Sequence, residues 1–251
     1  TNNTALGRSA GQAVTTGTEN TLIGGQSGDA LTEGTKNVAV GYGALTVDTK
    51  GSKSTAIGHE ALRNQNLTSA TDVFNVAVGF SAGNAVTTGV QNTLIGGLAG
   101  TAVTTGGFNT AVGYLSGSAL TSGTGNAFFG LRAGAGTTTG TANTFVGGSS
   151  NSYAGFANTT GTNNTAVGTD ALAANTTASN NVAVGMDALT TNITGTQNVA
   201  IGVEALGLNT TNNNTAVGFY ALRVNTSGTG NVALGYASLD ANTTGSSNTA
   251  V

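Results

Sequence analysis

The sequence predicts an all-β protein, a parallel β-solenoid with coils of about 17 residues. Two observations carry this prediction. One phrase, Asn-Thr/Val-Ala-Val/Ile/Leu-Gly, returns along the chain at a nearly constant spacing. The 251 residues also include 41 glycines and no proline or cysteine, yet 38% are hydrophobic and keep register with the phrase. A flexible Gly-rich linker would not keep such a register.

Each copy of the phrase begins at a polar residue, here called the anchor. The anchors are Asn3, Asn20, Asn37, Ser54, Asn75, Asn92, Asn109, Asn126, Asn143, Asn164, Asn181, Asn198, Asn214, Asn231 and Asn248. They lie 16 or 17 residues apart, except that Ser54–Asn75 and Asn143–Asn164 span 21. We therefore expect one repeat array over residues 1–251, with about 14–15 coils. Because it starts at Thr1 and stops within a copy at Val251, we also expect a fragment of a longer fibre.

Each copy can be interpreted locally. The residues after an anchor, such as Val182–Val184, are small or β-branched and favour a strand, and Gly185 ends it by supplying a positive φ. A second apolar pair, such as Ala188-Leu189, predicts a second short strand, and a polar corner such as Asn175-Thr176-Thr177 closes the coil. The frequent glycines, each costing about 1 kcal/mol inside a helix, disfavour the helical alternative.

Strand alternation places successive side chains on opposite faces. The third residue after each anchor, such as Val184, is always bulky and apolar, and we expect it to fill the coil. The second residue, usually alanine, would then face outward. Four coils have a larger residue there: Leu22, Leu94, Phe128 and Phe145. Because an exposed apolar column promotes aggregation, we expect another copy of the chain to cover it, which predicts a homo-oligomer.

The near-invariant anchors predict a structural ladder. Asparagine tolerates a left-handed φ at a corner, and stacked amides hydrogen-bond from coil to coil. The most regular rungs are Asn164, Asn181, Asn198, Asn214, Asn231 and Asn248.

Composition argues against several function classes. The net charge is −3 and the seven basic residues are scattered, so no nucleic-acid partner is expected. No apolar run approaches the roughly 20 residues that span a bilayer, so this segment is not expected to insert into a membrane. His59 is the only histidine, cysteine is absent, and no Gly-Lys-Ser/Thr follows the glycine-rich strings. We expect no enzyme activity and no cofactor. A polysaccharide-cleaving enzyme stays a minor alternative, since it needs clustered acid and base groups.

Three sets of residues are candidate sites. Asp170, Asp187 and Glu204 share one position in consecutive coils, which predicts a carboxylate column. We favour a hydrated edge over the alternative, a Ca²⁺ site. The two longer coils should bulge and form candidate recognition loops, which contain Asp72, Phe74, Tyr153 and Phe156. Aromatic residues follow the turn glycine in several coils, where we favour a wall between neighbouring chains over a sugar-stacking face. They are Tyr42, Phe80, Tyr114, Phe219 and Tyr236.

The phrases NVAVG, NTAVG and STAIG, followed by an Ala-Leu or Ser-Ala-Gly segment, resemble two groups of repeats across the whole chain. One is the head of trimeric autotransporter adhesins (the YadA-like head). The other is the repeat of phage tail fibres that end in a self-cleaving chaperone domain. The resemblance implies a left-handed β-roll, three chains side by side in a rod, and an extracellular adhesive or spacer role. The unit here is longer than the roughly 14 residues of typical adhesin heads, and no stalk, anchor or chaperone segment is present.

We therefore expect a segment of an extracellular fibre at a bacterial surface, with adhesion to a host-surface glycan or protein. The alternatives are a phage tail-fibre shaft on the virion and a polymeric surface filament. A less favoured one is an ice-binding solenoid, suggested by threonine pairs such as Thr15-Thr16, Thr87-Thr88 and Thr104-Thr105.

Overall fold

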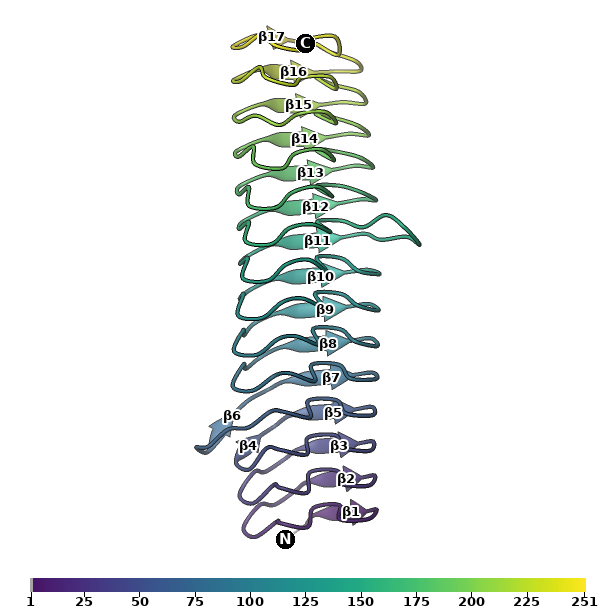
Figure 1. Cartoon of the computed structure of the whole chain (residues 1–251), viewed down its shortest axis with the longest axis vertical. Coiled ribbons are helices and arrows are strands. Elements are labelled where there is room, and N and C mark those ends of the chain that lie inside the picture. Colours follow the sequence, from purple (N-terminus) through teal and green to yellow (C-terminus); the bar gives the residue numbers. More distant parts are fainter. Residues whose placement is uncertain (1) are drawn as a thin grey trace. The chain divides into compact units, whose positions relative to one another are not determined.

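The computed structural model describes residues 2–251 and confirms an all-β parallel β-solenoid of about 15 coils, with no helix among those residues (Figure 1). The chain divides into two compact units, unit 1 (Thr1–Gly125) and unit 2 (Asn126–Val251), and each is described by itself. That residues 1–251 form one continuous array stays a prediction.

Each coil contributes one short strand to the sheet of its unit. Unit 1 contains β1 (Thr4–Leu6), β2 (Thr21–Ile23), β3 (Val38–Val40), β4 (Gly51–Ser52), β5 (Thr55–Ile57), β6 (Thr71–Asp72), β7 (Val76–Val78), β8 (Thr93–Ile95) and β9 (Thr110–Val112). Unit 2 contains β10 (Ala127–Phe129), β11 (Thr144–Val146), β12 (Thr165–Val167), β13 (Val182–Val184), β14 (Val199–Ile201), β15 (Thr215–Val217), β16 (Val232–Leu234) and β17 (Thr249–Ala250).

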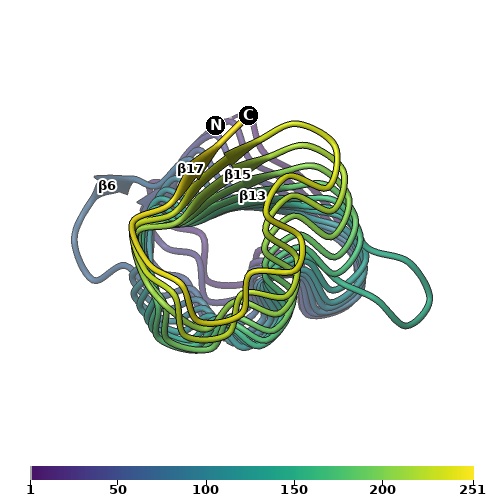
Figure 2. The same ribbon diagram turned by 90° about the horizontal axis from the view of Figure 1, so that it is seen from above.

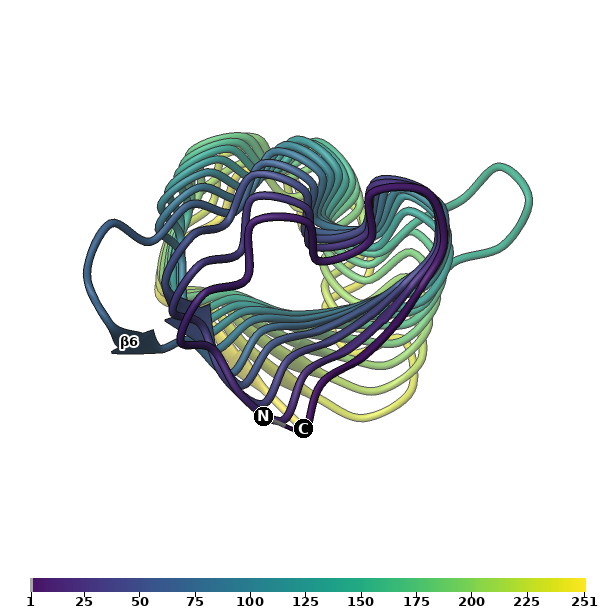
Figure 3. The ribbon, with the colours of Figure 1, turned by 90° about the horizontal axis from the view of Figure 1, so that it is seen from below.

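Strands of consecutive coils pair in parallel and in exact repeat register. In unit 2, for example, Ala183 of β13 pairs with Ala166 of β12 and Ala200 of β14. Equivalent positions therefore stack into columns about 4.8 Å apart. Viewed along the stack, each coil is a ring with the strand on one side and a winding segment on the other (Figures 2 and 3). The minor pair β4–β6 belongs to the longer coil of unit 1.

The predicted second strand of each coil was wrong, because the segment after the turn glycine is a run of turns. In the coil of Asn164, Asp170 and Leu172 have φ values of 55° and 52°, which break a strand. Hydrogen bonds alternate there: Ala171 N–H donates to Gly168 O within the coil, and Leu172 N–H donates to Ala188 O in the next. The segment thus uses every other amide to stack on its neighbour.

The predicted inside and outside of the strand were also wrong. The second residue after the anchor is fully buried in every coil but the two terminal ones, as at Ala183, whereas the third residue, such as Val184 or Ile201, is half-buried or exposed on the outer face. The reason is that Asn181, Ala183 and Gly185 lie two residues apart and so point the same way, and the asparagine is buried. The alanine column therefore does not require a second chain to cover it.

Two alternative packings fill the coil interior. Where the strand carries alanine, a buried leucine usually follows six residues later, as in Ala183 and Leu189. Where it carries a larger residue, that position is glycine: a Cβ on Gly100 would lie 2.6 Å from Leu94 Cδ2. A large side chain on the strand therefore excludes a large side chain at the facing position, since interiors are close-packed.

Candidate functional site

Buried asparagines form the spine of each unit. Asn181 Oδ1 accepts the backbone N–H of Asn198 at 3.0 Å, and Asn181 Nδ2 donates to Gly195 O at 2.9 Å and Asn164 Oδ1 at 3.3 Å. The same pattern includes Asn214, Asn231 and Asn248. The positive φ falls on the residue before the anchor, such as Asn180 at 63°, and not on the anchor itself. These asparagines hold coils together and are closed to ligands.

Unit 2 contains a second column of buried amides that the sequence analysis placed at polar corners. Asn225 Nδ2 donates to Asn209 Oδ1 at 2.8 Å, and Asn175 Nδ2 donates to Asn158 Oδ1 at 2.7 Å. In several coils of unit 1 the same position is apolar and buried, as at Val103. The signal that could have located the column is its fixed distance of 11 residues from most anchors.

The outer face of each sheet is charge-free. It consists of the first and third residues after each anchor, which are threonine, alanine or bulky apolar side chains, and all of them are half-buried or exposed. In unit 1 they are Thr4, Leu6, Thr21, Ile23, Val38, Val40, Thr55, Ile57, Val76, Val78, Thr93, Ile95, Thr110 and Val112. In unit 2 they are Ala127, Phe129, Thr144, Val146, Thr165, Val167, Val182, Val184, Val199, Ile201, Thr215, Val217, Val232, Leu234, Thr249 and Val251. We call this surface the outer sheet face.

An aromatic column borders this face. In unit 1 the rings of Tyr42, His59 and Phe80 stack with centroids 5.4 Å apart at each step. In unit 2 Phe219 and Tyr236 stack at 5.7 Å. Although these rings stack along the column, Tyr42, Phe80 and Tyr236 stay more than half exposed, so the column presents aromatic surface to solvent.

The two longer coils project from their units as separate loops (Figures 2 and 3). In the first, Asp72 pairs with Lys53 at 2.6 Å, and the Lys53 ammonium lies 5.1 Å from the ring centre of the exposed Phe74. The exposed tip of this loop is residues 68–70.

In the second loop the predicted recognition residue Tyr153 is only 9% exposed. Its N–H donates to Asp170 Oδ1 at 3.0 Å, its hydroxyl donates to Ser150 O at 2.8 Å, and its ring packs at a tilt against the ring of Phe156. Tyr153 therefore anchors the loop, and Phe156 and the polar tip, residues 149–151, face solvent.

The predicted carboxylate column is present, but its members do not converge. Across residues 2–251, no three His, Cys, Asp or Glu side chains are placed so that they could hold a metal ion. Asp170 accepts the Tyr153 N–H and Glu204 pairs with Arg223 at 3.7 Å. Burial raises the pKa of the Asp187 carboxyl, and the charges of Asp170 and Glu204 raise it further. Like charges in neighbouring coils thus disfavour an ionised Asp187.

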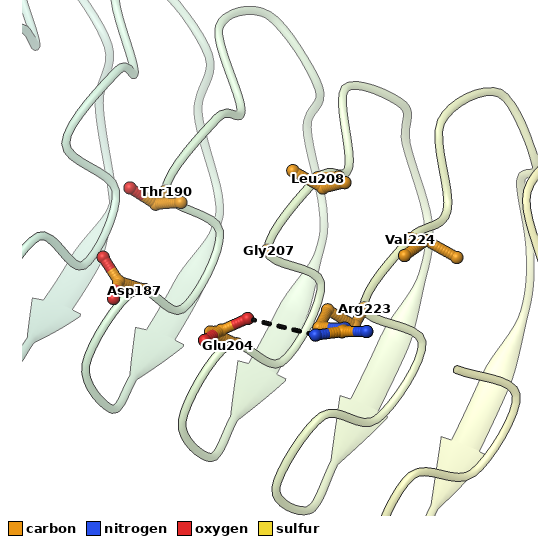
Figure 4. Close-up of a pocket in the computed structure, with 7 residues that line it drawn as sticks. All are labelled: Asp187, Thr190, Glu204, Gly207, Leu208, Arg223 and Val224. Atoms are coloured by element: carbon orange, nitrogen blue, oxygen red, sulfur yellow. Dashed lines mark ion pairs between the residues drawn. The ribbon is translucent and has the colours of Figure 1, made fainter. Parts of the chain in front are cut away.

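A cavity of about 340 Å³ opens beside this column (Figure 4). Its lining is Asp187, Thr190, Glu204, Gly207, Leu208, Arg223 and Val224. The hollow arises because Gly207 takes the repeat position that Thr190 and Arg223 take in the coils on either side. Because Gly207 has no side chain, the space that a side chain occupies at this position in the neighbouring coils is empty.

The chain also contains two Gly-x-Ser-x-Gly stretches that were not among the predicted sites. Gly7-Arg8-Ser9-Ala10-Gly11 and Gly79-Phe80-Ser81-Ala82-Gly83 match the spacing of a hydrolase nucleophile elbow. That elbow lies between a strand and a helix, whereas turns follow here. Ser81 has φ 50° at the repeat position where Asp170 and Asp187 also have positive φ, so the repeat explains the conformation.

Residues 2–251 contain no helix that is long and apolar enough to cross a membrane. In comparisons with known proteins, no protein-family model matches the chain and no curated protein is significantly similar to it.

Proposed function

We propose that this chain is a non-catalytic segment of an extracellular fibre, in which three copies associate through the outer sheet face and present the two loops for attachment. The observation that carries the proposal is the outer sheet face itself. It has no charged residue in any coil and keeps bulky apolar side chains such as Ile95, Ile201 and Leu234 at least 38% exposed. Contiguous exposed apolar surfaces of this kind mark association sites.

A second copy of the chain is the occupant that fits best. A flat, neutral and periodic surface offers a charged ligand nothing to pair with, whereas another copy repeats the same side chains at the same coil spacing. Homo-oligomers with cyclic symmetry are the commonest assemblies of soluble chains. The resemblance to trimeric adhesin heads supports three copies and a left-handed β-roll.

The association can be tested by light scattering coupled to gel filtration. The expected mass is three times the 24.2 kDa of one chain. The double variant Val184→Lys/Ile201→Lys places two ammonium groups on the face and should give monomers. Thr194→Lys, an exposed position outside the face, is the matched control and should stay trimeric. A stable wild-type monomer would rule out the proposal.

We propose attachment through the exposed loop tips, because they are the places where the repeat departs toward solvent. Many weak contacts along a fibre give avidity without a deep pocket. Shortening residues 149–152 to the length of an ordinary coil should reduce binding to host cells or glycan arrays while the trimer persists. Unchanged binding would exclude that loop.

The alternatives differ in what they would show. End-to-end filaments under the electron microscope would favour a polymeric surface filament, and a virion location would favour a tail-fibre shaft. The ice-binding alternative is weakened because Thr15, Thr87 and Thr104 each donate their hydroxyl to a carbonyl of the next coil. Measurable thermal hysteresis would restore it.

A further inference from the structure

We infer that the cavity at Gly207 in unit 2 is a binding site for a primary ammonium group carried on a short aliphatic chain. The site is distinct from the outer sheet face, because its lining comes from the turn segments and not from the strands. It does not depend on the proposed trimer.

The cavity combines acceptors with an apolar wall. Asp187, Glu204 and Thr190 supply oxygen atoms, and Leu208 and Val224 supply hydrocarbon surface (Figure 4). An ammonium has only N–H donors and no acceptor, so the carboxylate oxygens of Asp187 and Glu204 can accept from it. The methylene groups behind it would cover the two apolar side chains and remove them from water.

The charge balance also calls for a cation. Among residues 2–251 no lysine or arginine forms an ion pair with Asp187. Arg223 is the one cation in the lining, and it is engaged by Glu204 at 3.7 Å and by the Tyr220 ring at 4.5 Å. Asp187 thus lies between Asp170 and Glu204 of the neighbouring coils and has no cation of residues 2–251 paired with it. A bound cation would relieve that repulsion.

An organic cation fits better than a metal ion. Metal ions such as Ca²⁺ require six to eight oxygen ligands, and only three of the seven lining residues carry a side-chain oxygen. At the same distance, the positive charge of Arg223 repels a divalent ion about twice as strongly as it repels a singly charged ammonium. The volume, near the lower end of the range for ligand pockets, suits a single amine or one lysine side chain.

The test is a titration of the full chain, labelled at leucine and valine methyl groups, with n-butylammonium chloride and with 1-butanol as the neutral isostere. We expect butylammonium to shift the Leu208 and Val224 methyl resonances saturably and 1-butanol to shift them at least tenfold more weakly. Equal midpoints for the two probes would overturn the inference, since hydrophobic contact alone would then explain binding.

Two variants localise the effect. Asp187→Asn should weaken butylammonium binding at least tenfold, and Asp240→Asn, which removes the same charge outside the cavity, should leave it within twofold. Gly207→Thr fills the hollow with the residue found one coil earlier, and a Cβ there meets no atom closer than 3.2 Å, so this variant should fold and lose binding. Retained affinity in either cavity variant would refute the site.

Two further arms settle the chemistry. Displacement of butylammonium by CaCl₂, but not by NaCl of equal ionic strength, would overturn the assignment in favour of a metal. A lysine tripeptide with blocked ends separates the two sources of the ammonium. If the tripeptide binds as tightly as butylammonium, the site is supported and its natural ligand is the lysine side chain of a partner protein. If the tripeptide binds more than tenfold more weakly, the site is supported and its natural ligand is a free amine. The oligomeric mass, measured on the same samples, reports independently on the trimer.

Discussion

Replacing one buried asparagine of the ladder should destabilise the fold far more than the loss of a single polar side chain at the surface would. Asn181→Ala removes an acceptor for the Asn198 N–H and two donated bonds, to Gly195 O and Asn164 Oδ1. Gly195 O keeps a partner in Asn192 Nδ2, so the Asn198 N–H is the group left buried without one. That orphan costs about 1–3 kcal/mol and each lost bond about 0.5–1.5 kcal/mol, giving roughly 2–6 kcal/mol in all.

The assay is urea unfolding followed by circular dichroism, with amide hydrogen exchange at Asn198 as a local probe. The matched control is Asn180→Gly, which removes the adjacent exposed side chain and keeps a residue that accepts the observed φ of 63°. We expect the control to change the free energy of unfolding by less than about 1 kcal/mol. If Asn181→Ala matched the control, and the Asn198 amide kept its protection, the ladder would not hold the coils together as argued.

Three further outcomes are expected. Gly185→Ala should cost at least about 2 kcal/mol in urea unfolding, because its Cβ would lie 2.5 Å from the Gly202 carbonyl oxygen at a φ of +135°; an unchanged midpoint would contradict this. Asp187→Asn should raise the melting temperature at pH 7 and leave it unchanged below pH about 3.9, since a raised native pKa means that ionisation of Asp187 opposes folding above the unfolded pKa. A rise of equal size at both pH values would show that charge is not the cause. Leu189→Gly should cost about 2–5 kcal/mol by leaving a cavity, and adding Ala183→Leu should restore part of it, because unit 1 uses that pairing; no rescue would refute the volume argument.

The repeat period, the strand positions and the turn glycine could be predicted from the sequence because they follow from local chemistry. Val182–Val184 is β-branched at two of three positions, and only glycine suits the φ at Gly185. The face that points inward could not be assigned from hydrophobicity alone. The side chains of the strand alternate between two faces that are both largely uncharged. Because Val184 is larger than Ala183, size alone suggested that Val184 lay inside the coil. The decisive information was parity with Asn181, because an amide that bonds to the coils above and below must lie in the interior.

The second segment failed as a strand for a related reason. Asp170-Ala171-Leu172 has an apolar pair, but the backbone turns at Asp170 and Leu172. Aspartate only tolerates a positive φ better than most residues, and leucine gives no signal of one. Leucine pays that conformational cost here because its side chain fills the coil. Unit 1 reveals the constraint where glycine replaces leucine at the same position, as at Gly100. A repeat position that is leucine in some coils and glycine in others therefore indicates a left-handed backbone. Glycine adopts it without strain, and leucine adopts it because its side chain packs in the coil.

The candidate sites lie where the repeat is broken, and this follows from the physics of the stack. Interior columns tolerate little change, because each anchor and each turn glycine contacts the equivalent residue of the next coil. Departures at the surface are permitted, and each creates something the repeat lacks: a loop at residues 149–151, or a hollow at Gly207. The outer sheet face is the opposite case, since it stays free of charge in every coil although nothing within a single coil requires it. The association with further copies that we propose for the whole face would explain that uniformity, because every coil would then make the same external contact.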